Sequence, residues 1–152
     1  RLKLNSISNY SIIDKLYAAS EAGVKIDMII RGVCCLIPGV KGMSENINLI
    51  SIVDKFLEHP RVLIFGEEGE EKVYISSSDW MTRNLDNRVE VTCPIYDEDV
   101  KKEIIDTFTI CWNDNVKARE ITASQDNAYR INDKAPLRSQ FATYDYYLNK
   151  LN

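Results

Sequence analysis

The spacing of hydrophobic residues along the 152-residue chain changes repeatedly between the period of a strand and that of a helix. An apolar run over 2–7 predicts a first strand, and apolar residues at helical spacing predict a helix over about 11–22. Gly23 stands just past that helix, where a left-handed backbone is favoured, and the β-branched run 24–30 predicts a buried strand. Together these segments predict a βαβ unit.

The middle of the chain predicts further strands. Residues 46–58 fit both periods, and we interpret them as a strand that leads into a short helix. Residues 62–65 and 72–76 predict two strands of a hairpin around the acidic, glycine-containing turn 66–71.

The last third predicts one strand and two helices. A strand is expected over 88–92, before Pro94, and a helix from the carboxylates at 97–99 to about residue 112. Residues 114–137 are polar and predict irregular structure. A closing helix is suggested by four apolar residues at helical spacing: Phe141, Tyr144, Leu148 and Leu151. The predicted class is α/β with a mixed sheet.

Composition limits the function classes. The apolar fraction of 45% suits one globular domain, and the net charge of −4 argues against a general nucleic-acid-binding surface. No run reaches the roughly 18 apolar residues of a membrane span, and no signal segment stands first, so we expect a soluble, cytoplasmic protein. The chain starts at Arg1 and enters a strand at once, which suggests a piece of a longer protein.

The cysteines predict no metal site. Cys34, Cys35, Cys93 and Cys111 lack the spacing of zinc ligands, and three of them lie in apolar runs. We therefore expect buried free thiols.

Three places could carry chemistry. Arg31 follows the second predicted strand, at the edge of an open α/β sheet where ligands usually bind, and 36–42 predicts an irregular loop beside it. His59 and Arg61 could face one side of an extended segment and meet the same anion, although a lone histidine is more often structural. The polar run 75–90 could bind phosphate or could form a turn held by its own side chains.

Three ordered segments resemble the C-terminal signature of bacterial polyphosphate kinase: Arg31 to Gly39, Glu58 to Val62 and Ser77 to Val91. The likeness extends from residue 3 to residue 146, and the motifs are long. The chain is thereby identified as the second of two related C-terminal domains, 1–152, with a phospholipase D-like mixed sheet flanked by helices.

The resemblance implies an activity for the intact enzyme. That family reversibly transfers the terminal phosphate of ATP to inorganic polyphosphate through a phosphohistidine, and the nucleophilic histidine and the arginines that bind Mg²⁺ belong to the preceding domain. Arg31 matches an ATP-contacting arginine, and His59 matches a second histidine at the nucleotide site. The implied partners are ATP, ADP, polyphosphate and the preceding domains. The family is oligomeric and in some cases membrane-associated, and no nucleic-acid partner is expected.

These positions lead to one site hypothesis. Arg31, His59, Lys3 and Arg83 are expected to line a phosphate-binding pocket at the carboxyl edge of the sheet, with His59 in an assisting and non-covalent catalytic role. This chain alone is expected to be inactive and to bind no metal itself.

Two other functions stay open. A phospholipase D-like phosphodiesterase would need a lysine where Arg61 stands and an aspartate where Gly66 stands. A non-catalytic module for anion binding or oligomerisation is hard to distinguish from an isolated nucleotide-binding domain.

Overall fold

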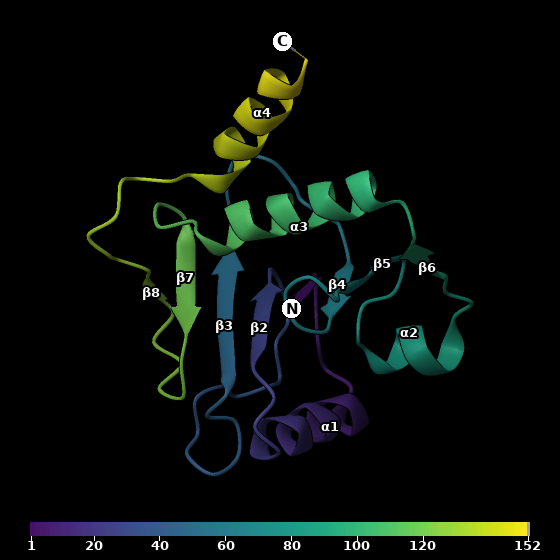
Figure 1. The fold of residues 1–152 in the computed structure, drawn as a ribbon. Helices are drawn as coiled ribbons and strands as arrows, with labels where there is room; N and C mark the ends of the chain where they lie inside the picture. The colour runs from purple at the N-terminus through teal and green to yellow at the C-terminus, as the bar shows by residue number, and fades with distance from the viewer. Residues whose placement is uncertain (152) are drawn as a thin grey trace.

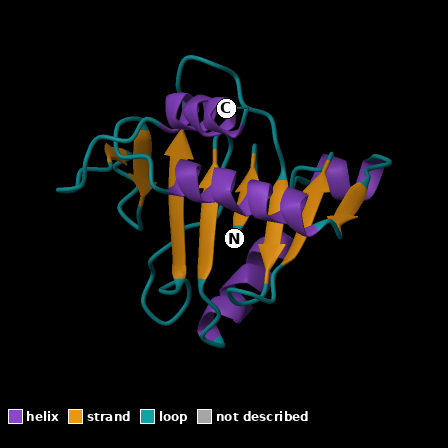
Figure 2. Ribbon diagram, turned by 45° about the horizontal axis from the view of Figure 1, so that its top comes forward, coloured by secondary structure: helices purple, strands orange, loops and turns teal. Residues whose placement is uncertain are grey.

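The computed structural model describes residues 1–151, which form one mixed sheet with helices on both faces (Figures 1 and 2). The predicted α/β class is therefore confirmed. The elements in chain order are β1 (Leu2–Leu4), α1 (Tyr10–Glu21), β2 (Ile26–Ile30), β3 (Ile47–Ile52), β4 (Val62–Phe65), β5 (Lys72–Ser76), α2 (Thr82–Asn87), β6 (Thr92–Ile95), α3 (Glu98–Trp112), β7 (Ala118–Ile121), β8 (Ala128–Tyr129) and α4 (Ser139–Lys150).

The sheet has a parallel centre and antiparallel sides. Its strand order is β6-β5-β4-β1-β2-β3-β7-β8, in which β1, β2 and β3 run parallel and the other pairs are antiparallel. The end at which β1, β2 and β3 finish is therefore also the end at which β4 and β7 begin. We call this end the carboxyl edge. The predicted βαβ unit and the β4–β5 hairpin are both confirmed.

Two apolar layers lie on opposite faces of the sheet. Side chains alternate between the two faces of the sheet along β1, so Leu2 and Leu4 face α1, whereas Lys3 faces α3. The helix α3 crosses the face of the sheet opposite to α1 (Figure 2). The layer under α1 includes Leu2, Leu4, Ile7, Ile13, Ile26, Met28, Ile30, Leu36, Ile47, Leu49 and Leu63. The layer under α3 includes Ile29, Ile50, Ile52, Ile64, Val73, Phe108, Cys111 and Ala118.

The helix ends follow their sequence signals. Asn9 caps α1 by accepting from the N–H of Ile12 at 3.1 Å, and Gly23 takes a positive φ of 88° just beyond it. Asp97 accepts from the N–H of Asp99 and Val100 at the start of α3. These predictions of helix and turn are confirmed.

The helix expected at the end of 46–58 is absent, and residues 53–61 form an irregular segment that leads to β4. Several of its groups bond α4 and the residue before it. Asp54 pairs with Arg138 at 2.5 and 2.8 Å, and the side-chain amide of Gln140 bonds both the N–H and the carbonyl of Phe56. The local apolar pattern favours a helix here, but the contacts with the rest of the fold stabilise an irregular conformation instead.

The strand expected over 88–92 lies instead at Thr92–Ile95 and contains Pro94. Proline fits there because, within residues 1–151, β6 is an edge strand that pairs with β5 on one side and with no strand on the other. Before it, Val91 is bonded through both its N–H and its carbonyl to Ser77, and the unpredicted helix α2 occupies 82–87.

Residues 114–137 contain the strands β7 and β8, which the polar sequence did not predict. The edge of β3 supplies a partner for β7, with Leu49 opposite Ile121. The buried carboxylate of Asp114 orders the approach to β7 by accepting from the N–H groups of residues 116–118 and Ser139. Hydrogen bonding rather than hydrophobic pattern thus fixes this region.

The expected burial of the cysteines was wrong for most of them. All four cysteines are free, but only Cys111 is buried, whereas Cys35 and Cys93 are exposed, because one lies in a loop and the other on edge strand β6. The helix α4 is confirmed, but its four predicted apolar residues are 42–85% exposed, because α4 packs on α3 at the rim of the molecule (Figure 1). Within residues 1–151, no helix has the length and hydropathy needed to cross a membrane.

Candidate functional site

The carboxyl edge brings Asn5 and Arg31 together, because each follows the end of one of two paired parallel strands. The buried side-chain oxygen of Asn5 accepts from Arg31 Nε at 3.0 Å and from Arg31 Nη2 at 2.7 Å. This forked contact fixes the plane of the guanidinium and leaves Arg31 half-buried.

Gly32 permits the close approach of these two loops. Its N–H donates to the carbonyl of Asn5 at 2.7 Å. A Cβ atom at Gly32 would lie 3.1 Å from both the Asn5 carbonyl oxygen and Ser6 Oγ, which is tighter than ordinary packing. The absence of a side chain at Gly32 therefore helps to place Asn5 beside Arg31.

The second half of the site is built around Asp79, which follows β5. Asp79 Oδ1 accepts from the N–H groups of Asn5 and Ser6 at 2.8 and 3.1 Å, so this carboxylate anchors the loop after β1. Its Oδ2 accepts from Arg61 Nη2 at 2.9 Å and from Asn5 Nδ2 at 3.4 Å. Burial alone raises the pKa of Asp79, but hydrogen bonds from Arg61, Ser6 and Asn5 outweigh it and lower the pKa.

His59 and Arg61 lie on the same side of the extended segment before β4, which confirms their expected orientation. Arg61 Nη1 lies 2.9 Å from His59 Nδ1, and Nη2 lies 3.1 Å from Nε2. The guanidinium of Arg61 therefore lies directly against the imidazole ring of His59. Arg61 is thus held between Asp79 and the exposed His59 ring.

These five residues, Asn5, Arg31, His59, Arg61 and Asp79, are called the edge cluster below. The edge cluster contains two guanidinium groups but only one carboxylate, which Arg61 contacts, so its excess positive charge favours an anion. Each arginine is oriented by a buried side chain, as a phosphate-binding group requires. The hydrogen bonds place Arg31 and His59 in the same connected network.

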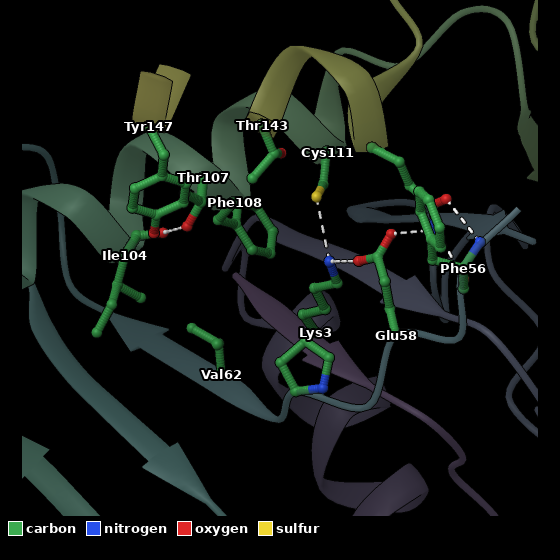
Figure 3. A pocket seen from close by; sticks show the side chains of 12 residues that line it. Lys3, Phe56, Glu58, Val62, Ile104, Thr107, Phe108, Cys111, Thr143 and Tyr147 are labelled. Carbon is green, nitrogen blue, oxygen red and sulfur yellow. Dashed lines mark hydrogen bonds and ion pairs between the residues drawn. The ribbon is translucent and has the colours of Figure 1, made fainter. Parts of the chain in front are cut away.

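Lys3 lies apart from this cluster, contrary to the expectation that it shares a pocket with Arg31. It points to the α3 face, where its Nζ bonds Glu58 at 2.5 Å and Cys111 Sγ at 3.1 Å (Figure 3). The strand period explains the separation, since neighbours on β1 face opposite sides of the sheet.

The surroundings of Lys3 form a cavity of about 330 Å³ between β1, β4, α3, α4 and the segment 53–61 (Figure 3). Glu58 and Pro60 line this cavity, while His59 and Arg61 contact each other. The extended backbone therefore separates a mostly apolar cavity from the edge cluster.

Arg83 stands exposed on α2, and within residues 1–151 no polar contact joins it to Arg31 or His59. Ser77 and Ser78, which precede it, form hydrogen bonds that stabilise the turn. Ser77 donates to Glu90 and its oxygen accepts from the N–H of Val91, while Ser78 donates to the carbonyl of Asp79. The structural interpretation of 75–90, a turn held by its own side chains, is the one these contacts support.

The carboxylates near the edge cluster do not fit a magnesium site. Both oxygens of Asp79 accept from nitrogen donors, and Glu90 accepts from Ser77 and Asn84. Among residues 1–151, no three metal-ligating side chains converge. Any role of Mg²⁺ at this site therefore needs ligands beyond these carboxylates.

Sequence reasoning did not select Asn5 or Asp79 as site residues. A signal existed for both: Asn5 directly follows a strand at the edge where Arg31 was expected, and Asp79 lies within the polar run 75–90. Their partners could not be assigned, because Asn5 and Asp79 are 74 residues apart in the chain.

Similarity to known proteins covers almost the whole chain. Residues 1–140 match the family model described as polyphosphate kinase C-terminal domain 2. The chain belongs to the polyphosphate kinase family. Polyphosphate kinase from Vibrio parahaemolyticus is 55% identical over 150 residues, and the one from Escherichia coli K12 is 47% identical over 146 residues. These alignments cover 97% and 95% of this chain.

A crystal structure shows the same fold within a larger enzyme. Polyphosphate kinase from Porphyromonas gingivalis superposes with a TM-score of 0.94 at 47% identity, covering 98% of this chain and 23% of that one. The chain likewise spans about a fifth (21%) of the length of the Vibrio and Escherichia relatives. This polyphosphate kinase domain therefore corresponds to one part of each of these longer proteins.

Proposed function

We propose that this domain provides the nucleotide-binding part of an ATP–polyphosphate phosphotransferase. Arg31 carries the proposal, because its guanidinium is held in a fixed plane at the edge of the sheet by the buried oxygen of Asn5. A preorganised arginine can stabilise charge on phosphate oxygens without reorganising during the reaction. The relatives are named polyphosphate kinase, and the reaction that we propose is the one that the family resemblance implies, transfer of the terminal phosphate of ATP to polyphosphate.

The proposed roles follow from position. Arg31 and Arg61 would bind phosphate oxygens, and the exposed ring of His59 would donate a hydrogen bond to a phosphate or assist proton transfer. The covalent phosphohistidine and the Mg²⁺ ligands would lie in the preceding domain. Lys3 faces the other side of the sheet, and Arg83 lacks a contact with the edge cluster, so neither belongs to the proposed core of the site.

A phosphodiesterase activity has less support. The position at which that superfamily carries an aspartate is Gly66, which lies in the β4–β5 turn at the far end of β4 from His59. The carboxylate that contacts Arg61 is instead Asp79. We therefore expect no hydrolysis of a simple phosphodiester.

The test is a calorimetric titration of the complete polypeptide with ATP in the presence of Mg²⁺. Loss of a charge-assisted, forked contact in R31A should weaken ATP binding roughly ten- to a hundredfold. The control is K102A, which removes the same charge from an exposed position on α3. Equal affinity of R31A and the wild type would refute the proposal, and equally strong binding of inorganic phosphate and ATP would favour a general anion-binding module.

A further inference from the structure

Asp79 connects the two halves of the edge cluster. On one side it contacts Asn5, which holds Arg31, and on the other it contacts Arg61, which lies against His59. Only 8% of its side chain is exposed. We propose that Asp79 is a positioning residue that sets the orientation of both Arg31 and Arg61 for nucleotide binding, a role that rests on the proposed function.

The link to Arg31 depends on the polarity of the Asn5 side chain. An asparagine amide has a donor end and an acceptor end. A carboxylate can only accept, so the Asn5 side chain directs its Nδ2 donor to Asp79. The opposite end of the amide, Oδ1, then faces Arg31 and accepts from its guanidinium. The charge at Asp79 thereby determines which end of Asn5 faces the arginine.

The link to Arg61 uses the same carboxylate. Oδ1 accepts from two backbone N–H groups and from Arg61 Nε at 3.3 Å, while Oδ2 accepts from Arg61 Nη2. Both ends of the Asp79 side chain are therefore acceptors in use. An asparagine at this position has only one acceptor end, so it must place its own NH₂ group against a donor.

D79N has a predictable consequence at the site. If the new side chain keeps its oxygen on the N–H groups of Asn5 and Ser6, its NH₂ group faces Arg61 and Asn5 Nδ2. Asn5 then gains a hydrogen bond by reversing its amide, which turns its NH₂ group toward Arg31. Donors would face donors at both arginines, so both guanidinium groups should move.

A matched variant, D114N, distinguishes positioning of the arginines by Asp79 from a general contribution of Asp79 to stability. Asp114 is fully buried and also uses both oxygens, with Oδ1 on the N–H groups of Val116, Lys117 and Ala118 and Oδ2 on that of Ser139. It makes no contact with the edge cluster. D114N therefore removes a comparable acceptor without changing the surroundings of Arg31 or Arg61.

The experiment measures KM for ATP and kcat for polyphosphate synthesis in the complete polypeptide, with wild type, R31A, D79N and D114N. Thermal melting should show that D79N and D114N both lower Tm. Only D79N should raise KM, by roughly tenfold or more, with a smaller change in kcat. Because Asp79 acts partly through Arg31, adding D79N to R31A should raise KM by a smaller factor than D79N alone.

A crystal structure of the D79N enzyme separates the two claims. If R31A raises KM but D79N does not, Asp79 is not a positioning residue, whereas the proposed function stands. If neither variant changes KM, the proposed function fails, and with it the part of Asp79 in nucleotide binding; the structure then tests only whether Asp79 orients the two arginines. Displaced Arg31 and Arg61 side chains would support that role, and unchanged side chains would overturn it.

Discussion

Lys3 Nζ lies 3.1 Å from Cys111 Sγ within the cavity beneath α3 and α4, and it also bonds Glu58. Burial raises the pKa of the Cys111 thiol, and the nearby Lys3 ammonium only partly offsets this effect. The same cysteine packs in the apolar layer with Phe108. Cys111 is thus a shielded thiol that is less acidic than an ordinary cysteine.

This environment predicts the order of thiol modification. With iodoacetamide at about pH 8, close to the ordinary cysteine pKa of about 8.5, the exposed Cys35 and Cys93 should react well before Cys111. Peptide mapping by mass spectrometry measures the order. In concentrated urea all four cysteines should react at similar rates, which is the control. Fast labelling of Cys111 in the native protein would contradict its described burial.

Substitution of Gly32 should disturb both fold and site. In G32A the new Cβ atom presses on the Asn5 carbonyl and on Ser6 Oγ, so we expect a loss of about 1–3 kcal/mol in the free energy of unfolding and weaker ATP binding. Urea unfolding and calorimetry measure the two effects.

The control for this substitution is G39A. Gly39 has a positive φ of 73° and open space around its Cα, so alanine there should cost stability through backbone strain alone. ATP affinity should remain near the wild-type value. Equal loss of affinity in both variants would show that general destabilisation, rather than movement of Asn5, explains G32A.

We expect Asp114 to cause part of the loss of fold stability at acid pH. Burial acts to raise its pKa, but hydrogen bonds from Ser139, Lys117 and Ala118 outweigh burial and lower the pKa from its ordinary value of 3.8. A lowered folded-state pKa adds stability above the ordinary value, and this stability disappears as pH falls through the folded-state value. At neutral pH, D114N should be less stable by about 1–3 kcal/mol.

The pH dependence checks that assignment. The difference in unfolding free energy between wild type and D114N should shrink as pH falls from about 5 to about 2, because the wild-type carboxylate becomes protonated. E67Q, which changes an exposed carboxylate in the β4–β5 turn, serves as the control and should show little difference throughout. A constant gap for D114N across this range would mean that the charge of Asp114 does not stabilise the fold.

The elements that sequence predicted well are those with a strong hydrophobic period or a specific local signal. The βαβ unit followed from its apolar spacing and from Gly23, and α3 followed from Asp97 and the carboxylates of its first turn. By contrast, β7 and β8 have a polar sequence and depend on the edge of β3 and on Asp114, which no local pattern reveals. Short-range patterns therefore identified the centre of the sheet better than its sides.

Two positions of the edge cluster could be predicted from the sequence, but the contacts between its members could not. The end of a parallel strand identified Arg31, and an extended segment identified His59 with Arg61. Period-two alternation could also have placed Lys3 opposite Leu2 and Leu4, since that rule alone puts it on the other face. The bond between Asn5 and Asp79 joins distant segments and required the folded chain.

The central proposal is that this domain binds the nucleotide while the covalent step takes place outside residues 1–152. Rapid-quench measurement with γ-labelled ATP, followed by peptide mapping of the phosphorylated enzyme, tests it in the complete polypeptide. For R31A, the ATP concentration that gives half-maximal phosphoenzyme should rise roughly tenfold or more, the maximum should stay close to that of the wild type, and the label should map outside this chain. Labelled His59, or an R31A curve identical to that of the wild type, would contradict the claim.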